Sequence, residues 1–178
     1  MAETPTTDRL RLRFVARDEA PLLERLYAFE AGGFNDFGLG LRSIPDDQWT
    51  DGELRTPQRA TLFIEDVDGG DILGTISYHR VTYGPNEQSG AWMLGIELLP
   101  EARGRGIGSE AQRVLADWLF ATTDANRVEA STDVENIAEA RALEKAGFRR
   151  EGVNRGAQFR AGGYHDLVLY ARLRSDPR

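Results

Sequence analysis

The segment that most constrains this chain is a glycine-rich loop, "LLPEARGRGIGSEAQ", at residues 98–112. It follows an apolar run at 91–99 and leads directly into a segment with helical periodicity. It contains Gly104, Gly106 and Gly108. A helix N-terminus offers unpaired N–H groups and the positive end of the helix dipole, and glycines let the backbone approach a bulky anion. Because Arg103 and Arg105 add charge-assisted donors, the loop predicts a phosphate or pyrophosphate site.

Three glycine-rich sequence patterns that bind phosphate are candidates for this loop, and a simple tight turn is the structural alternative. A P-loop requires Lys and then Ser or Thr after its last glycine, but Ile107 follows Gly106. The dinucleotide fingerprint G-x-G-x-x-G, begun at Gly104, requires a glycine where the chain has Ser109. The pattern Arg/Gln-x-x-Gly-x-Gly fits at every position from Arg103 to Gly108.

The composition is that of an ordinary globular chain, and we expect one domain over 1–178 with flexible ends at 1–8 and 175–178. Cysteine is absent, which removes disulfides, thiolate metal sites and a cysteine nucleophile. His79 and His165 are the only histidines, so we expect no metal. A net charge of −7 argues against a nucleic-acid partner. The sequence shows no membrane span and no signal peptide, and we expect a cytoplasmic location.

Hydrophobic periodicity predicts a mixed α/β (α+β) fold. We expect Asp18 to cap the first helix, Asn136 to cap the last, and Gly147 to end it. The region 32–58 is expected to be loop with a short helix near 45–54. The predicted strands are 10–16, 60–67, 72–81, 91–99, 127–132 and 166–173, and the predicted helices begin near 19, 107 and 136.

The sequence resembles the GNAT superfamily of acetyl-CoA-dependent N-acetyltransferases. The resemblance lies in "GIELLPEARGRGIGSEAQRVLADWLF" and "NRVEASTDVENIAEARALEKAGFRREG", and it points to the RimJ/RimL-like branch of ribosomal-protein N-acetyltransferases. That branch also contains acetyltransferases of antibiotics, peptides and other small amines. The resemblance implies a central, mostly antiparallel twisted sheet flanked by helices. A splayed pair of parallel strands in that sheet would hold acetyl-CoA as co-substrate, with no metal.

The resemblance also assigns coenzyme contacts by position. The backbone of Ile96, Glu97 and Leu98 would bond the pantetheine amides. Asn136 would contact the pantetheine or its phosphate end, although a purely structural helix cap is the alternative. The diphosphate would be wrapped by Arg103, Gly104, Arg105, Gly106, Ile107, Gly108 and Ser109.

For the chemistry, the candidate bases are Glu97, beside the thioester by sequence, and Glu129 on the adjoining strand. A solvated face or an arginine partner is the alternative for both carboxylates. The N–H of Leu98 is the expected oxyanion donor. Leu143 stands where many members of the superfamily place a tyrosine that protonates the departing thiolate. Ser131, Tyr164 or water would then supply that proton.

The acceptor pocket is expected to involve Trp49, Trp92, Tyr164 and His165, with core packing as the alternative for Trp92. The predicted function is direct acetyl transfer to a primary amine, either a peptide or protein N-terminus or a small amine such as an antibiotic. The alternative is a catalytically inactive acetyl-CoA-binding regulatory protein. A homodimer is compatible with the resemblance.

Overall fold

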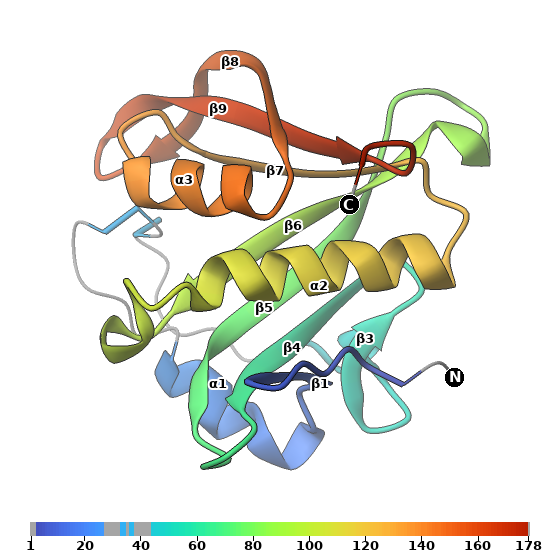
Figure 1. Ribbon diagram of the computed structural model, residues 1–178, viewed down its shortest axis with the longest axis vertical. Helices are drawn as coiled ribbons and strands as arrows, with labels where there is room; N and C mark the ends of the chain where they lie inside the picture. Colours follow the sequence, from blue (N-terminus) through green and yellow to red (C-terminus); the bar gives the residue numbers. More distant parts are fainter. Residues whose placement is uncertain (1–2, 27–32, 35, 38–43, 178) are drawn as a thin grey trace.

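The computed structural model describes residues 3–26, 33–34, 36–37 and 44–177. Its centre is a sheet with the strand order β2-β3-β4-β5-β6-β7-β9-β8, and β1 pairs with β4 (Figure 1). The pairing is antiparallel throughout, except for the parallel pair of β6 and β7. The strands are β1 (Leu10–Phe14), β2 (Trp49–Thr50), β3 (Glu53–Thr56), β4 (Arg59–Asp66), β5 (Ile72–Thr82), β6 (Gly90–Leu98), β7 (Arg127–Asp133), β8 (Arg149–Arg160) and β9 (Gly163–Leu173).

Helices cover both faces of this sheet. They are α1 (Ala20–Leu26), α2 (Ile107–Thr122) and α3 (Ile137–Lys145). Alternation along β4 divides the core: Leu62 and Ile64 pack in the cluster with α2, whereas Phe63 packs with Leu23 of α1 in a second cluster. The helices α2 and α3 therefore lie on one face (Figure 1), and α1 lies on the other. The predicted mixed α/β class is confirmed.

The strands β6 and β7 pair over a short length and then separate. Their register runs from Trp92 opposite Val128 to Leu94 opposite Ala130. On its other edge β6 stays paired with β5 as far as Leu98. The last four residues of β6 therefore keep one strand neighbour in the described structure and leave a gap on the β7 side.

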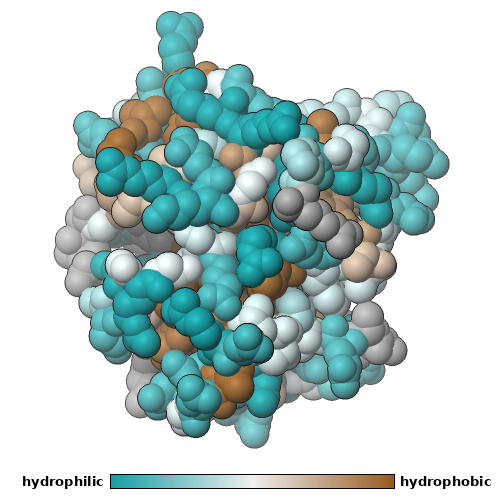
Figure 2. Space-filling model, viewed as in Figure 1, coloured by the Kyte–Doolittle hydropathy of each residue, from teal (hydrophilic) through white to brown (hydrophobic). Residues whose placement is uncertain are grey.

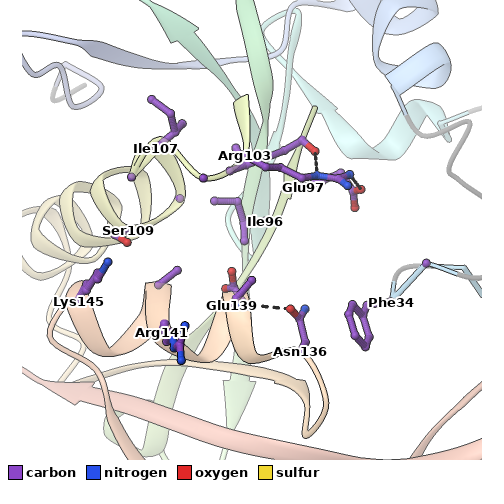
Figure 3. A pocket seen from close by; sticks show the side chains of 17 residues that line it. Phe34, Ile96, Glu97, Arg103, Ile107, Ser109, Asn136, Glu139, Arg141 and Lys145 are labelled. Carbon is purple, nitrogen blue, oxygen red and sulfur yellow. Dashed lines mark hydrogen bonds and ion pairs between the residues drawn. The ribbon is translucent and has the colours of Figure 1, made fainter. Parts of the chain in front are cut away.

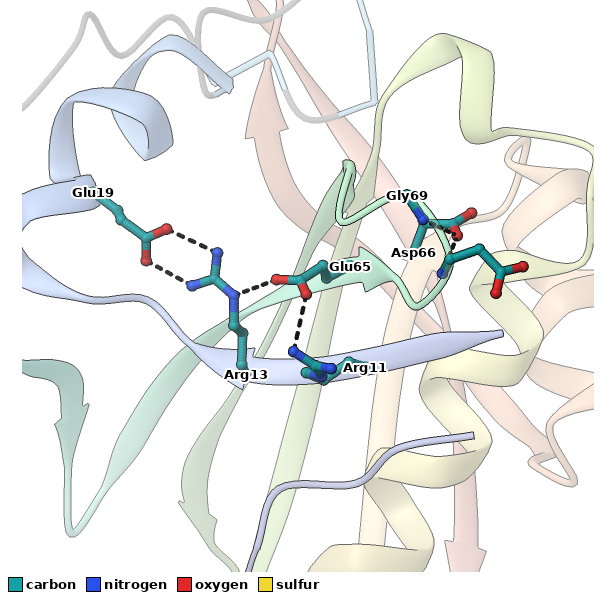
Figure 4. Close-up of polar contacts among 7 residues, drawn as sticks. Arg11, Arg13, Glu19, Glu65, Asp66 and Gly69 are labelled. Carbon is teal, nitrogen blue, oxygen red and sulfur yellow. Dashed lines mark hydrogen bonds and ion pairs between the residues drawn. The ribbon is translucent and has the colours of Figure 1, made fainter. Parts of the chain in front are cut away.

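The first helix begins with a different cap from the one expected. A 3₁₀ turn at Arg17–Glu19 precedes α1, and Ala16 stands at its N-cap. Glu19, and not Asp18, provides the capping carboxylate, accepting from the Ala16 N–H at 3.0 Å. Arg13 fixes that carboxylate through two bonds of 2.7 and 2.8 Å and bonds Glu65 at 2.5 Å (Figure 4). The Asp18 prediction failed because the helical turn begins two residues earlier than the sequence pattern indicates.

The region 45–54 forms a short 3₁₀ turn, Asp46–Gln48, followed by the β2–β3 hairpin. Asp51 and Gly52 occupy its turn with φ of 53° and 78°. Both central residues of a type I′ hairpin need positive φ, so the Asp-Gly pair accounts for the hairpin. The expected short helix near 45–54 is thus replaced by one 3₁₀ turn and two strands.

Residues 3–8 lie against the body of the protein, although the sequence predicts a flexible end. The Leu12 N–H donates to the Pro5 carbonyl at 2.9 Å, and the Trp118 indole donates to the Glu3 carbonyl at 2.8 Å. These bonds add an irregular segment beside β1. Hydrophilic side chains cover much of the face that carries α2 and α3 (Figure 2). None of the described helices is long and apolar enough to cross a bilayer.

Candidate active site

The glycine loop has the left-handed backbone that its sequence predicts. Gly104 and Gly106 have φ of 72° and 80°, a region that costs an L-residue about 1–2 kcal/mol. Gly106 is the N-cap of α2, and no side chain caps this end. The first N–H groups of α2 are therefore oriented by backbone alone at the end of the loop.

A cleft of about 630 Å³ opens between this loop, the end of β6 and α3 (Figure 3). Most of the predicted coenzyme residues line it: Ile96, Glu97, Leu98, Arg103, Gly104, Gly106, Ile107, Gly108, Ser109 and Asn136. Arg105 is the exception. Its side chain is exposed, and its carbonyl accepts from Arg9 at 3.1 Å, which ties the loop to the segment before β1.

The backbone of β6 presents its hydrogen-bonding groups to the gap at alternate residues. The Leu99 N–H donates to the Leu73 carbonyl at the start of β5, so it points toward that neighbour. Alternation then directs the polar backbone groups of Ile96 and Leu98 to the opposite edge, toward the separated β7. An extended chain with amide groups fits this edge as an added strand would.

Three basic side chains line the cleft. Arg103 stands on the loop, and Arg141 and Lys145 stand on α3 across from it (Figure 3). Arg141 and Lys145 are four residues apart on one helical face, together with Ala138 and Ala142. Sequence reasoning missed this pair. The helical spacing that follows the Asn136 cap was the signal that would have found it.

Asn136 caps α3, as predicted, by accepting from the Glu139 N–H at 3.2 Å (Figure 3). The capping box is incomplete, because the Glu139 side chain lines the cleft beside Gln112 of α2. Burial raises the pKa of the Glu139 carboxyl from 4.5 to about 7, and the Gln112 amide opposes part of that rise. Near pH 7 the Glu139 carboxyl is therefore only partly ionised, so it makes the α3 side of the cleft polar but weakly charged.

Glu97 lies on the opposite face of β6 from Ile96 and Leu98. Its side chain, 21% exposed, lines the cleft and approaches Arg103 to 4.0 Å (Figure 3). Arg103 also donates to the Leu98 carbonyl at 3.0 Å. One arginine thus connects the coenzyme loop, the end of β6 and the candidate base.

Glu129 is buried at 1% exposure and belongs to a separate polar network. It accepts from the Tyr83 hydroxyl at 2.8 Å and from Arg127 at 2.5 Å. Arg127 in turn bonds Glu151 at 2.6 and 2.9 Å. Glu129 does not line the cleft described above, and its partners hold it as an acceptor where the parallel strands are still paired.

The two candidate tryptophans of the acceptor pocket lie away from the cleft. Trp92 is 6% exposed and packs edge-on against Tyr78 at 5.1 Å between ring centres. Its indole donates to the Thr123 hydroxyl at 3.3 Å. Trp49, in β2, packs against the α1-side core, with Arg17 over its ring. The structure therefore gives both tryptophans a packing role.

The β8–β9 hairpin carries the two remaining acceptor candidates. Tyr164 is 76% exposed and packs against Phe159 at 5.2 Å. His165 Nδ1 lies 3.3 Å from Asp133 and 3.1 Å from Arg160. Asp133 and Arg160 form a buried ion pair, and Arg160 lies over the Phe34 ring, which lines the cleft. His165 therefore contacts Arg160, and Arg160 in turn contacts the ring of Phe34 in the cleft wall.

Leu143 is fully buried in the α2-side core, and the cleft-lining residues of α3 lie on either side of it in sequence. It has no acidic hydrogen, and its side chain faces away from the cleft. Ser131 lines a smaller cavity of about 120 Å³ between β6 and β7. That cavity continues the cleft, since Phe34, Ile96, Asn136 and Glu139 line both.

The separated parallel strand pair and the glycine loop at a helix N-terminus are the arrangement that the resemblance implies for an acyltransferase using coenzyme A thioesters. The chain belongs to the acetyltransferase (GNAT) family, whose domain model matches residues 9–149. It is accordingly an acetyl-CoA-dependent acyltransferase.

Three similar proteins illustrate the relationship. N-acetyltransferase p20 of Bacillus licheniformis is 24% identical over 98% of both chains. The ribosomal-protein-S5-alanine acetyltransferase of Vibrio fischeri superposes with a TM-score of 0.77 at 21% identity, over 99% of this chain and all of that one. The Vibrio cholerae spermidine N-acetyltransferase, solved with CoA and spermine, has a TM-score of 0.74 at 19% identity, over 96% of this chain and 98% of that one. At these identities the superpositions confirm the fold.

Proposed function

We propose that this protein transfers the acetyl group of acetyl-CoA directly to a single, weakly basic primary amine, with a peptide or protein α-amino group as the acceptor. The observation that carries the proposal is the cleft between the separated strands. In this cleft the glycine loop, which suits a diphosphate, lies next to the edge of β6 whose amide groups face the gap. The Glu97 carboxylate lies beside them.

The residues of the cleft fit the coenzyme in three separate ways. The N–H groups that open α2, together with Arg103, Arg141 and Lys145, would hold the phosphates. The edge groups of Ile96 and Leu98 would bond the amides of the pantetheine arm. The N–H of Leu98, at the end of the gap, would stabilise negative charge on the carbonyl oxygen. When bound, the thioester supplies the activated acetyl group.

The composition of the chain favours direct attack by the amine, because no cysteine is present to carry the acetyl group. Alignment of amine and thioester contributes up to about 7–11 kcal/mol in well-oriented systems. Glu97 is placed to collect the proton, either directly or through water. Parallel double-reciprocal lines in initial-rate kinetics would contradict a ternary complex.

The charge on the sheet face opposite α2 indicates which class of amine the protein accepts. Three carboxylates lie on the face of β6 and β7 opposite α2: Glu97, Glu129 and Asp133. Each has an arginine partner. An adjacent cavity of about 210 Å³ on that face is lined by Arg59 and His79, with no acidic residue in its described lining. A polycation would find little compensating charge there, whereas an α-amino group of pKa about 7.7–8.0 is roughly a tenth neutral at pH 7 without help.

The test is a competition between acceptor classes at one acetyl-CoA concentration. Release of CoA is followed with a thiol reagent, which has no protein background because the chain lacks cysteine. We expect peptides with a free N-terminus to give a higher kcat/KM than the same peptides with a blocked N-terminus and a free lysine. Spermidine should be a poor substrate. Equal or better turnover of spermidine would refute the acceptor class, and no turnover of any amine would refute the transfer itself.

A further inference from the structure

The cavity of about 210 Å³ on the sheet face opposite α2 has a lining that suits a negatively charged group. It lies on β4 and β5, the two strands that continue the sheet from β6 (Figure 1). One wall is apolar, with Leu23 of α1 and Leu54 of β3. No carboxylate is present in the described lining. The residues whose side chains can donate a hydrogen bond into it are Gln48, Arg59, Thr61, Ser77 and His79.

Arg59 is the cation of this cavity, and it is exposed. It has no carboxylate partner among the described residues. Other arginines near this face of the sheet are paired, Arg127 with Glu129 and Arg160 with Asp133. A guanidinium carries its N–H donors in a planar fork that matches the two oxygens of a carboxylate. The fork of Arg59 is therefore available to a ligand.

His79 lies directly opposite Arg59 in the β4–β5 register, and Met93 of β6 lies opposite His79 on the other side. Partial burial and the charge of Arg59 lower the pKa of His79 below 6.5, and Glu129 opposes part of that change. Near pH 7 the imidazole is therefore mostly neutral and offers one N–H donor. One cation among neutral donors matches the single charge of a carboxylate better than the two charges of a phosphate.

The cavity lies within reach of an acceptor whose amine is beside Glu97. Ser77, in its lining, pairs with Gly95 of β6, two residues before Glu97. With strands about 4.8 Å apart and about 3.3 Å per residue, Ser77 is roughly 8 Å from Glu97 and Arg59 is roughly 16 Å from it. An extended peptide covers the same rise per residue. Its second to fourth residues would therefore lie over the cavity.

We propose that Arg59 and His79 form a specificity site that binds a carboxylate of the acceptor, a few residues beyond the reacting amine. This inference rests on the proposed function, because it requires a peptide acceptor in the site. The carboxylate is either an acidic side chain at the second to fourth position or the C-terminus of a short peptide. Arg59 binds it through charge-assisted hydrogen bonds, and His79 with the hydroxyls of Thr61 and Ser77 donates beside it. None of these residues takes part in proton transfer.

The experiment measures initial rates with a set of tetrapeptides that have a free N-terminus. The reference peptide has glutamine at positions two to four and an amidated C-terminus. Three further peptides replace one glutamine each by glutamate, and a fourth keeps the glutamines but has a free C-terminal carboxylate. We expect one of these four to have a KM about tenfold below that of the reference, with a similar kcat, because the carboxylate adds charge-assisted hydrogen bonds that are kept throughout the reaction. The peptide that gains identifies the source of the carboxylate.

Arg59→Gln should remove this advantage, so that the KM of the preferred peptide rises about tenfold toward that of the reference. Arg59→Lys keeps the charge without the planar fork and should retain part of the preference. Arg113→Gln is the matched control, because it removes the same charge from an exposed position of α2, on the other side of the sheet. It should leave the preference intact. Calorimetric titration with CoA checks that all three variants are folded.

Three results would overturn the inference while leaving the enzyme intact: equal KM values for all five peptides in the wild type, a preference that survives in Arg59→Gln, or an equal loss of preference in Arg113→Gln. Failure of the proposed function looks different. In that case the wild type would acetylate none of the peptides, or it would turn over spermidine at least as well as the reference peptide.

Discussion

Glu139→Gln should change the pH dependence of folding stability in a defined direction. Burial holds the pKa of Glu139 at about 7, against 4.5 for an ordinary glutamate. Between these two values the folded protein retains a proton that the unfolded chain has released. The free energy of unfolding of the wild type therefore falls as pH rises from 4.5 to 7 and levels off above 7.

The size of the effect follows from the difference between the two pKa values. About 2.5 units at 1.36 kcal/mol per unit gives about 3 kcal/mol, all of it expressed above pH 7 and none below pH 4.5. Glutamine has a similar size and helix propensity but does not titrate. The variant should match the wild type near pH 4.5 and exceed it by up to about 3 kcal/mol at pH 8.

Urea denaturation of both proteins without coenzyme, at half-unit steps from pH 4.5 to 8, measures this difference. Glu135→Gln, just before the Asn136 cap and exposed, is the control and should run parallel to the wild type. A difference between the Glu139 variant and the wild type that stays constant across the range would refute the reasoning. It would mean that the carboxyl keeps its ordinary pKa in the folded protein.

Three further predictions concern single residues. Gly106→Ala should lower the free energy of unfolding by about 1 kcal/mol in urea denaturation and weaken CoA binding, because φ is 80° at this position. Gly108→Ala should have a smaller effect, because the atom nearest the added Cβ would be 3.5 Å away. Asn136→Ala should cost about 1 kcal/mol. Asn136→Asp should restore stability but not CoA affinity in titrations, since it adds a negative charge to the cleft. Glu129→Ala should lower the free energy of unfolding by about 3 kcal/mol, because Arg127 and Tyr83 lose a buried acceptor; an unchanged denaturation midpoint would contradict this.

The parts of the site that the sequence predicts are those fixed by local backbone chemistry. Gly104 and Gly106 adopt the left-handed geometry that a glycine loop permits, and Gly147 ends α3 at φ 89°. Asn136 caps α3 through its own side chain. Each of these depends on residues within four positions in the chain, so one sequence contains enough information to place them.

Strand β8 illustrates what local pattern misses. Most of its residues are exposed, so it has no alternation of apolar and polar positions that would mark a strand. It exists because β9 pairs with it, with irregular register between Arg150 and Gly152 and between Asn154 and Gln158. That pairing brings Arg160 to Asp133 and so places a buried ion pair beside the gap.

The aromatic candidates show the same limit of local pattern. Trp49 and Trp92 are large enough to line a pocket or to fill a core, and sequence spacing does not distinguish these uses. Tertiary packing decides, and it turns Trp92 toward Tyr78. Phe34, which lies in the region that the sequence predicts as loop, is an aromatic residue that lines the cleft.

The register of the parallel pair distinguishes the two candidate bases. Met93 lies opposite Glu129, whereas Glu97 is four residues further along β6. At about 3.3 Å per residue the two carboxylates are separated by roughly 13 Å along the strand direction. The gap opens after Leu94, on the Glu97 side, while Glu129 lies where the strands are still joined and is held by Tyr83. A thioester carbonyl near the Leu98 N–H would therefore lie beside Glu97, and Glu129 would be too far away to take a proton from the same amine.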